Sequence, residues 1–436
     1  MNGRETNLGN ISLLLKPFQR FGVNLGLERI ERLLADLGNP QERVPIIHVA
    51  GTNGKGSVCA YLSSVLTAAG YRVGRYTSPH LVNWTERITL NEEQIAETAL
   101  IAVLQKVIAK AEIAPETPTQ FEVITAAAWL YFAQSQVDVA VIEVGLGGRL
   151  DATNVCDRPL ASIIVSLSKE HWQRLGSTVA KIAVEKAGVL KPDCPAIVGS
   201  LPPDAAAVVQ TRITELNCPA IWVQPATEIT SKDARRWARY RDMEYPLPLL
   251  GQMQLNNSAI AIATIRVLQQ KGWQITPQAI VDGMARTRWQ GRIQWYSWRE
   301  RDMLIDGAHN PAAAKFLRRY VDTLKQPVIW LMGMLSTKDH RDILQALLRP
   351  DDELYLVPVP DRSTAEPQKL ALLARQICPN LTRCQIETDL FAALNNIDDL
   401  RKVETLSERD NREKLIVLCG SLYLIGYFFR EVRNRR

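Results

Sequence analysis

Short apolar runs alternate with stretches of helical periodicity in the first half of the chain. Residues 44–51, 137–145 and 161–167 are apolar runs of strand length, and we predict that they form buried strands. Residues 57–69 and 177–190 carry apolar side chains at helical spacing, which predicts two helices. Gly70 is suited to end the first helix, and Ser177 or Thr178 to cap the start of the second.

The alternation resumes late in the chain. It predicts strands at 302–307, 327–333, 353–358 and 414–419, and helices at 311–324, 339–348 and 366–377. Strands that alternate with helices favour parallel sheets covered by helices, an α/β fold. The stretch 240–250 is rich in Pro and Leu and predicts a linker or irregular loop. The new series starts after residues 291–301, so we expect two domains, 1–292 and 293–436.

Composition and charge narrow the class of protein. The apolar fraction is 46% and the charged fraction 22%, as in a folded globular chain rather than a disordered one. A formal charge of +6 suits polyanionic small molecules such as ATP or a glutamate tail. The arginines near 235–241 and in the last seven residues are best explained as a solvated surface. We therefore expect no nucleic-acid partner.

The cysteines and the apolar runs bear on where the protein acts. No pair among the seven cysteines has C-x-x-C spacing, which predicts reduced thiols. The first ten residues are polar, and no apolar signal segment follows them. The longest apolar run, 415–429, is interrupted by Gly420, Ser421 and Gly426 and is too short to cross a membrane. We expect a cytoplasmic protein with no membrane partner.

The strongest local motif is a glycine-rich segment that leaves a predicted strand and opens a predicted helix. It consists of Gly51, Thr52, Asn53, Gly54, Lys55, Gly56 and Ser57. Glycines let backbone amides approach phosphate oxygens, and a helix N-terminus favours negative charge. Lys55 would reach the β- and γ-phosphates, and Ser57 would hold Mg²⁺.

The match to G-x-x-x-x-G-K-[ST] is imperfect. Val49 stands at the first glycine position, and Gly56 separates Lys55 from Ser57. A glycine-rich turn with one surface lysine is the simpler alternative. The strand before the segment and the helix after it favour a phosphate-binding loop.

Together with motifs along nearly the whole chain, this loop resembles the folylpolyglutamate synthases of the Mur ligase superfamily, including the bacterial bifunctional form that is also dihydrofolate synthase. In chain order the motifs are Leu25-Gly26-Leu27-Glu28-Arg29-Ile30, His48 to Ser57, Tyr76-Thr77-Ser78-Pro79-His80-Leu81, Phe121-Glu122, Glu143 to Val155, His171, Glu185-Lys186-Ala187-Gly188, Gly291-Arg292, Asp306 to Pro311, Gly333-Met334-Leu335 with Lys338-Asp339, and Gly420-Ser421-Leu422-Tyr423. Any one of these motifs is weak evidence, but their common order is specific.

The resemblance implies a fold and a reaction. The fold would be a P-loop-containing, Mur-ligase-like ATPase domain over 1–292, which also binds the folate or pterin, and a smaller Rossmann-like α/β glutamate ligase domain over 293–436. The reaction would join L-glutamate to dihydropteroate, to folyl(poly)glutamates or to both. ATP would convert the carboxylate to an acyl phosphate, and the amine of glutamate would displace phosphate. A monomer is implied, with pteroate or folate, L-glutamate and ATP as its small-molecule partners.

The resemblance also implies roles for individual residues. ATP would be held by Gly51 to Ser57, Asn257, Arg292 and Asp306. One Mg²⁺ would be held by Ser57, Ser78 and Glu143, and a second by His171 and a carbamylated Lys186, with a K⁺ site left open. Catalysis would use Lys55, His171, Lys186 and His309. Substrate would contact Val23, Leu25, Thr119, Phe121, Asp151, Ala152, His309 and Ser421, and Asn310 and Lys338 are weaker candidates. A site divided in this way predicts domain closure on ATP binding.

Each assignment has a structural alternative. Glu143 could be a carboxylate at a strand end, Lys186 a lysine on a helix surface, and Phe121 an ordinary core residue. Four of the five histidines fall inside the motifs, which favours function over chance.

Two departures from the family pattern affect the site. The segment before His171 is Leu167-Ser168-Lys169-Glu170, where the family often has Leu-Asp-His. Met253 stands where the family has a histidine near the adenine, so packing could persist there but an imidazole contact could not.

Other functions are open at this point. A Mur-type ligase acting on a UDP-muramyl substrate would need a further N-terminal domain, and only about 50 residues precede Gly51. A non-catalytic nucleotide-binding module would lack the loop or the metal-ligating residues, all of which are present. A small-molecule kinase would not explain the motifs after residue 291.

Overall fold

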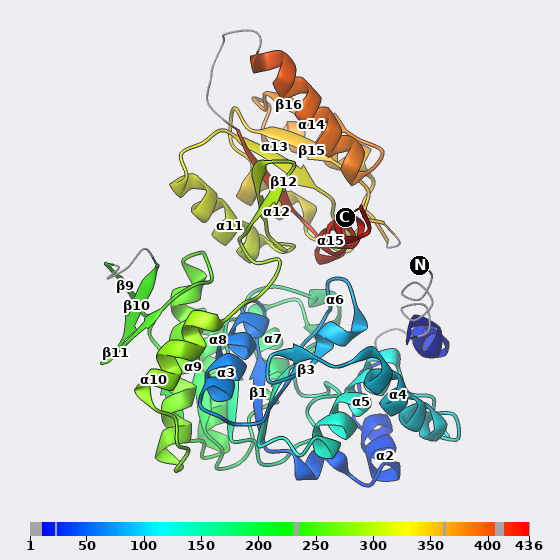
Figure 1. Ribbon diagram of the computed structural model, residues 1–436, viewed down its shortest axis with the longest axis vertical. Helices are drawn as coiled ribbons and strands as arrows, with labels where there is room; N and C mark the ends of the chain where they lie inside the picture. Colours follow the sequence, from blue (N-terminus) through cyan, green and yellow to red (C-terminus); the bar gives the residue numbers. More distant parts are fainter. Residues whose placement is uncertain (1–10, 22–23, 231–234, 361–362, 406–413, 436) are drawn as a thin grey trace. The chain divides into compact units, whose positions relative to one another are not determined.

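The computed structural model describes residues 11–21, 24–230, 235–360, 363–405 and 414–435. The chain divides into two compact units (Figure 1). The N-terminal unit comprises Met1–Pro248 and Met253–Arg288, and the C-terminal unit comprises Leu249–Gln252 and Trp289–Arg436. Each unit has its own sheet, so each is described by itself.

The N-terminal unit is built on an eight-stranded sheet in the order β4-β3-β2-β5-β1-β6-β7-β8. Its strands are β1 (Ile46–Ala50), β2 (Val73–Tyr76), β3 (Ile88–Leu90), β4 (Glu93–Gln94), β5 (Val139–Glu143), β6 (Ala161–Ile164), β7 (Ala196–Val198) and β8 (Ala220–Trp222). All neighbours are parallel except β2 with β3 and β3 with β4. Every residue of β1, β5 and β6 is buried, as expected for central strands covered on both faces.

Helices cover both faces of this sheet. They are α2 (Glu28–Asp36), α3 (Lys55–Ala68), α4 (Glu97–Ala111), α5 (Gln120–Gln134), α6 (Trp172–Leu175), α7 (Val179–Ala187), α8 (Pro203–Glu215), α9 (Met253–Gln270) and α10 (Pro277–Arg286), with 3-10 helices η1 (Lys16–Phe21), η2 (Pro40–Arg43) and η3 (Trp84–Arg87). Ile46 and Ile142 pack with α2, α4 and α5 in one core. On the other face α3 packs against β2, β5 and β1 and is flanked by α9 and α10 (Figure 1).

A small antiparallel sheet corrects one expectation. The strands β9 (Thr227–Ile229), β10 (Trp237–Tyr240) and β11 (Met243–Pro246) pair in the order β11-β10-β9. The stretch 240–250, predicted to be a linker or irregular loop, therefore contains a turn and a strand. The hairpin forms because Arg241 adopts a φ of 55° at the turn and Tyr245 is buried, where its hydroxyl lies 3.0 Å from Ser258 Oγ.

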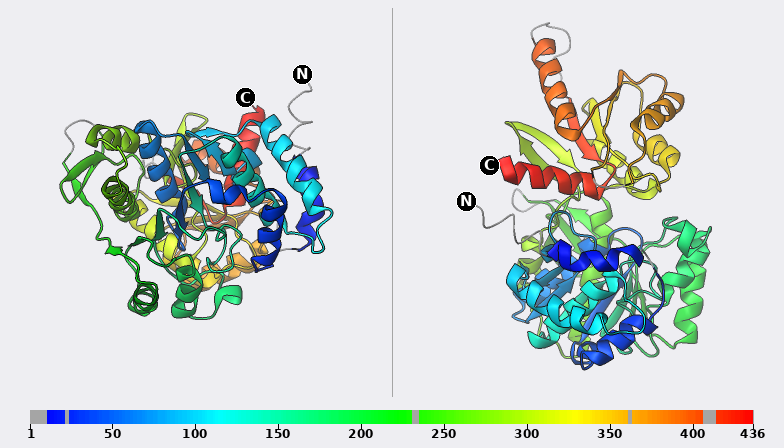
Figure 2. Two further views of the ribbon diagram at one scale, coloured as in Figure 1. Left: turned by 90° about the horizontal axis from the view of Figure 1, so that it is seen from below. Right: turned by 90° about the vertical axis from the view of Figure 1, so that its right-hand side faces the viewer.

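The C-terminal unit holds a six-stranded sheet in the order β12-β13-β17-β14-β15-β16. Its elements are β12 (Gln294–Trp298), β13 (Arg301–Ile305), α11 (Pro311–Thr323), β14 (Val328–Met332), α12 (His340–Leu347), β15 (Glu353–Leu356), α13 (Pro367–Ile377), β16 (Arg383–Ile386), α14 (Leu390–Thr405), β17 (Leu415–Cys419) and α15 (Leu422–Arg435). Only β12 is antiparallel to its neighbour. Figure 2 shows α14 and α15 on the face opposite α11 to α13, and the rings of Phe391 and Phe428 stack at 6.2 Å between these two helices.

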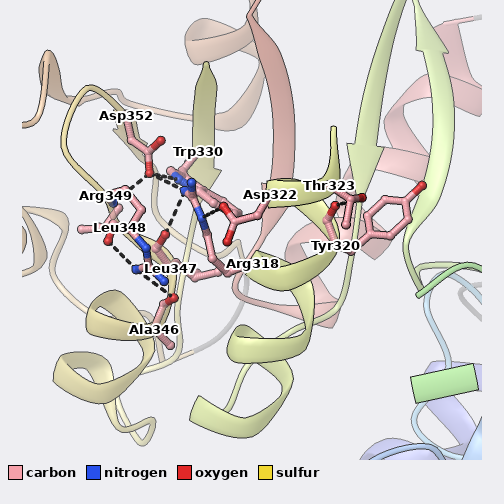
Figure 3. Close-up of polar contacts among 10 residues, drawn as sticks. All are labelled: Arg318, Tyr320, Asp322, Thr323, Trp330, Ala346, Leu347, Leu348, Arg349 and Asp352. Carbon is pink, nitrogen blue, oxygen red and sulfur yellow. Dashed lines mark hydrogen bonds and ion pairs between the residues drawn. The ribbon is translucent and has the colours of Figure 1, made fainter. Parts of the chain in front are cut away.

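A buried ion pair holds this second unit together away from the carboxyl ends of its strands (Figure 3). Arg318 on α11 binds Asp352 at 2.6 Å, just before β15. The same carboxylate oxygen accepts hydrogen bonds from Trp330 Nε1 at 3.0 Å and from the amide of Arg349 at 2.9 Å. Burial raises the pKa of Asp352, an effect that Trp330 and Arg318 oppose. One carboxylate thus connects α11, β14 and the end of α12.

Within the described ranges, no helix has both the length and the apolar character needed to cross a membrane.

Candidate active site

Four neighbouring strands of the N-terminal sheet end at the same edge. The strands β2, β5, β1 and β6 are adjacent and parallel, so the segments that follow them gather at their carboxyl ends. Ser78 follows β2, Glu143 is the last residue of β5, the glycine-rich loop follows β1, and His171 lies in the segment after β6. The topology therefore places most of the predicted nucleotide and metal residues at one edge.

The glycine-rich loop is tied to the segment after β6. The amide of Thr52 donates to Ser166 O at 2.7 Å, and the amide of Asn53 donates to Ser166 Oγ at 3.2 Å. Thr52 Oγ1 also accepts from the amide of Ser168 at 3.1 Å. These contacts fix the chain immediately before α3, whose first amides have no carbonyl partner within the helix.

Helix α9 supports the loop from behind. Gly54 caps α3 with a φ of 88°, and a Cβ there would lie 2.5 Å from Asn257 Oδ1. Asn257 is buried and donates to Gln254 Oε1 at 3.0 Å, and Gln254 in turn donates to Ser57 Oγ at 3.4 Å. The predicted nucleotide residue Asn257 thus sits directly against the loop. Met253, at the position of the missing histidine, begins the same helix.

Lys55, Ser78 and Glu143 form a charged cluster at the start of α3. Lys55 Nζ lies 3.8 Å from Glu143 Oε1 and donates to Thr52 O at 3.3 Å. The other oxygen of Glu143 accepts from the amide of Ser78 at 3.1 Å. Glu143 is only 5% exposed, so it is not a surface carboxylate at a strand end. The structure brings these three predicted residues together, and Ser57 is buried in the first turn of the helix that Lys55 begins.

The donors of this cluster fit Mg²⁺. The part of the chain that the structure describes holds no group of three or more His, Cys, Asp or Glu side chains arranged around a common point. Mg²⁺ commonly takes one or two carboxylates and completes its shell with water and substrate phosphates. Glu143 with the hydroxyls of Ser57 and Ser78 is a donor set of that kind.

Lys186 reaches the loop from α7. Its side chain is buried, and Nζ donates to Gly51 O at 2.8 Å. Burial, and then the charge of Lys55, lowers the pKa of Lys186 to about 7. Burial rules out a lysine on the helix surface. As an ammonium group Lys186 is a hydrogen-bond donor and cannot ligate a metal. His171 is exposed at the start of α6 with a φ of 50°, and its pairing with Lys186 at a second metal stays a prediction.

The predicted acceptor residues lie around the turn after β5. Phe121 on α5 packs over Gly145, where a Cβ would overlap its ring. Thr119 caps α5 and accepts from the amide of Glu122 at 3.2 Å. Ala152 is buried, Leu25 is half-buried just before α2, and Val23 lies outside the described residues.

Asp151 and His48 belong to one buried chain of hydrogen bonds. Asp151 accepts from the amide of Leu146 at 2.7 Å and from the amide and hydroxyl of Thr153 at 3.1 and 2.6 Å. Burial raises the pKa of Asp151, an effect that these donors oppose. His48 Nε2 lies 2.9 Å from Thr153 Oγ1, and burial lowers the pKa of His48 to about 3. Because the Thr153 hydroxyl donates to Asp151, neutral His48 must carry its hydrogen on Nε2.

The C-terminal unit holds a second cluster of predicted residues, after β13 and β17. Asp306 accepts from the amides of Ile293 and Ala308 at 2.9 and 2.8 Å. Burial raises the pKa of Asp306, and Arg292 opposes that effect. The Arg292 side chain lies against Gly307, where a Cβ would overlap it.

His309 and Ser421 complete this cluster. His309 Nδ1 lies 2.7 Å from Gly307 O, so that nitrogen carries the hydrogen and the ring is fixed. Ser421 is buried, and its hydroxyl accepts from the amide of Tyr423 at 3.2 Å. Asn310 caps α11 by accepting from the amide of Ala313 at 2.9 Å, which accounts for it structurally.

The supporting roles of Ser166 and Gln254 were not predicted from the sequence. Ser166 bonds the loop across 113 positions, and Gln254 reaches Ser57 across 197. No local pattern marks contacts of this range. His48 and Arg29 did stand inside named motifs, but their roles depend on partners that only the fold reveals.

The comparisons agree with this geometry. The model of the family described as Mur ligase middle domain matches residues 49–265, and that described as dihydrofolate synthetase, C-terminal domain, matches residues 292–431. The chain is 36% identical over 425 residues to the folylpolyglutamate synthase of Lacticaseibacillus casei, covering 94% of this chain and 95% of that one. It is 37% identical over 427 residues to the dihydrofolate synthase/folylpolyglutamate synthase of Escherichia coli (strain K12), covering 95% and 93%.

Solved structures give the same result over the whole length. A Mycobacterium tuberculosis folylpolyglutamate synthase complexed with ADP and AMPPCP has a TM-score of 0.86 and 28% identity, covering 100% of both chains. The E. coli FolC in complex with DHPP and ADP has a TM-score of 0.82 and 29% identity, covering 98% of both. The phosphate-binding loop and two-unit α/β fold thus define a ligase of the Mur type. Within that class, the chain belongs to the folylpolyglutamate synthase and dihydrofolate synthase family.

Proposed function

We propose that this chain joins L-glutamate to dihydropteroate, to folyl(poly)glutamates or to both, with ATP as the energy source. The γ-phosphoryl group moves to the acceptor carboxylate, and ADP leaves. The amine of glutamate then attacks the acyl phosphate, an amide bond forms, and phosphate departs with loss of a proton from the amine. The observation that carries the proposal is the cluster of Lys55, Ser78 and Glu143 at the start of α3, in a chain of this family.

Each residue of the N-terminal cluster has a distinct task in this scheme. Lys55 carries a charge toward the phosphates at the N-terminus of a 14-residue helix, where the helix dipole adds to it. Ser57, Ser78 and Glu143 would hold Mg²⁺, which supplies charge neutralisation at the phosphates when bound. Asn257 and Ser166 keep the loop in place, so its amides are arranged before the nucleotide arrives.

The acceptor and the glutamate would be held by other residues. Phe121 offers a ring face to the flat pterin, with Leu25, Thr119, Asp151 and Ala152 around it. In the domain assignment we propose, residues 1–292 bind ATP and acceptor, and residues 293–436 complete the ligase. Arg292 and Asp306 would bind phosphate and ribose, and His309 and Ser421 the incoming glutamate. The E. coli relative solved with both DHPP and ADP supports a site for an acceptor and a nucleotide in one protein.

The decisive measurement is phosphate release by the purified protein with Mg-ATP and L-glutamate. Dihydropteroate and tetrahydrofolate are compared as acceptors. Release with both supports the bifunctional form, and release with one assigns the single step. Lys55→Ala should lose at least about 100-fold in rate, because a charge aimed at the transferring phosphoryl group is worth that much. Lys110→Ala, on the exposed side of α4, is the matched control and should keep full activity. No acceptor-dependent release by the wild-type protein would contradict the proposal.

The proposal includes a carbamylated Lys186 as an oxygen ligand for a second Mg²⁺ with His171. The amine nitrogen would bond to the carbon of CO₂ and lose a proton, which replaces an ammonium by a carboxylate. Its support is the burial of Nζ beside Gly51 rather than in solvent. Mass spectrometry of the intact protein kept in bicarbonate should show the mass of one added carboxyl group, absent in Lys186→Met. If both proteins have unmodified masses, Lys186 acts only as a donor to the loop.

The proposal further includes a monomeric state, a cytoplasmic location and a requirement for K⁺. Analytical sedimentation of the purified chain tests whether it is a monomer. Replacing KCl by NaCl in the phosphate-release assay tests the K⁺ requirement.

A further inference from the structure

Arg29 joins two segments of chain that are far apart in the sequence. It lies in the first turn of α2, and its side chain is only 9% exposed. Nη2 donates to Asn24 O at 2.8 Å, in the segment that carries Leu25. The same nitrogen lies 3.0 Å from Glu122 Oε1, and Nε donates to Glu122 Oε2 at 3.3 Å. One guanidinium group therefore binds the segment before α2 to the start of α5.

The partner carboxylate is part of the cap of α5. Glu122 is 2% exposed, and its Oε2 accepts from the amide of Thr119 at 2.5 Å. Thr119 caps the helix in return, so the two residues form a capping box. Phe121 lies between them in the sequence, with its ring over Gly145. The orientation of this helix start, and of the Phe121 ring, depends on where Glu122 is held.

The segment before α2 also depends on the arginine. Gly26 has a φ of 152°, and a Cβ there would lie 3.7 Å from the guanidinium nitrogens of Arg29. The chain thus folds back over the charged group of Arg29. A second carboxylate, that of Glu116, is 65% exposed and lies 4.0 Å from Arg29 Nη1, too far and too solvated to substitute for Glu122.

We propose that Arg29 and Glu122 are positioning residues for the acceptor, which they hold in register without touching it. The pair sets the separation between Leu25 on one side and Thr119 and Phe121 on the other. Its effect is therefore on the affinity for the pterin-bearing substrate, not on ATP or the chemical step. This inference rests on the proposed function, because Leu25, Thr119 and Phe121 are its acceptor residues.

The test separates acceptor binding from nucleotide binding. Arg29→Met and Glu122→Gln are assayed for the KM of dihydropteroate, tetrahydrofolate and ATP, and for ADP binding by calorimetry. We expect the acceptor KM to rise roughly 10- to 100-fold, because small displacements of positioning groups have effects of that size. The KM for ATP, the Kd for ADP and kcat should change less than about threefold. Arg236→Met, which breaks the Arg236–Glu228 pair on the small sheet, should change none of these values.

Two further variants exclude a general loss of structure. Arg29→Lys keeps the charge but lacks the fork that reaches both Asn24 and Glu122, so its acceptor KM should fall between wild type and Arg29→Met. If Arg29→Met does not fold, Arg29→Lys replaces it in the test. The double variant should be no worse than Arg29→Met alone, because the two residues act as one unit. Equal losses for ATP and acceptor, or no loss for either, would overturn the inference. A wild-type protein that neither binds nor converts any folate would instead remove the proposed function itself.

Discussion

A single methyl group is enough to test the phosphate-binding loop, because two glycines of the N-terminal unit have similar positive φ angles but different surroundings. Gly54 has a φ of 88° and Gly272 a φ of 92°. A Cβ at Gly54 would lie 2.5 Å from Asn257 Oδ1 and 3.0 Å from Val165 Cγ1, whereas nothing lies within 4 Å at Gly272. Both alanines carry the backbone strain, about 1–2 kcal/mol, but only one disturbs neighbours.

We therefore expect Gly54→Ala to weaken ADP binding at least about tenfold, since Asn257 must leave the loop or the loop must shift. Gly272→Ala should bind ADP like the wild type and lose only a little thermal stability. Titration calorimetry of the two variants measures the difference directly. Equal affinities in all three proteins would show that Asn257 does not define the loop.

At the scale of elements, Arg318 in the C-terminal unit binds two carboxylates that differ in burial. Arg318 binds Asp352, which is buried, and Asp322, whose side chain is 48% exposed, at 2.6 and 2.7 Å (Figure 3). Removing Asp352 leaves a charge, an indole and an amide without their acceptor inside the protein. Asp352→Ala should therefore lower the free energy of unfolding by about 3–5 kcal/mol.

Asp322→Ala is the internal control, since an exposed ion pair is worth about 0–1 kcal/mol. Urea unfolding followed by fluorescence compares the two variants at the same arginine. Similar losses for both would mean that burial does not govern this network.

Local patterns predicted the central strands of both large sheets because their causes are local, whereas helices such as α4, α5 and α9 were not predicted. The apolar runs before Gly51 and around 137–145 and 161–167 are the central strands β1, β5 and β6, and Thr178 caps α7 as predicted, accepting from the amide of Lys181 at 3.2 Å. The strand β11 was missed because only its pairing with β10 makes residues 243–246 extended. The residues of the candidate site divide in the same way, into those that local motifs predict and those that depend on tertiary contacts. The loop, Glu143 and Asn257 could be named from motifs, but the contacts by which Ser166 and Asn257 support the loop are tertiary and could not.

At the scale of the whole molecule, two compact units predict two unfolding transitions. Scanning calorimetry should resolve them, because two-state behaviour usually fails for chains built of distinct units. ADP should raise the transition of the N-terminal unit, which holds the phosphate-binding loop. Asp352→Ala should lower only the other. A single transition that moves as one in both experiments would contradict separate units.

The pH dependence of stability gives a second, independent way to assign the two unfolding transitions to the two units. His48 has a folded pKa of about 3 against an ordinary value of 6.5. The unfolded chain therefore takes up a proton first, and stability is lost as pH falls from 6.5 toward 3, by about 1.4 kcal/mol per pH unit. Only the N-terminal transition should show this loss. His48→Gln, which keeps an amide donor toward Thr153 but does not titrate, should lack it between pH 6.5 and 5.

The close packing of α10 on α3 delays the complete folding of the N-terminal unit during synthesis on the ribosome. A Cβ at Gly283 would overlap the backbone of Val65, and Ser64 Oγ donates to Gly283 O at 2.7 Å across 219 positions of sequence. At about 5–20 residues per second, roughly 10–40 s pass between the synthesis of α3 and that of its partner α10. During that interval the face of α3 that packs on α10 in the folded protein is exposed. A nascent chain stalled before residue 253 should therefore be a chaperone client, and one released beyond residue 288 should not.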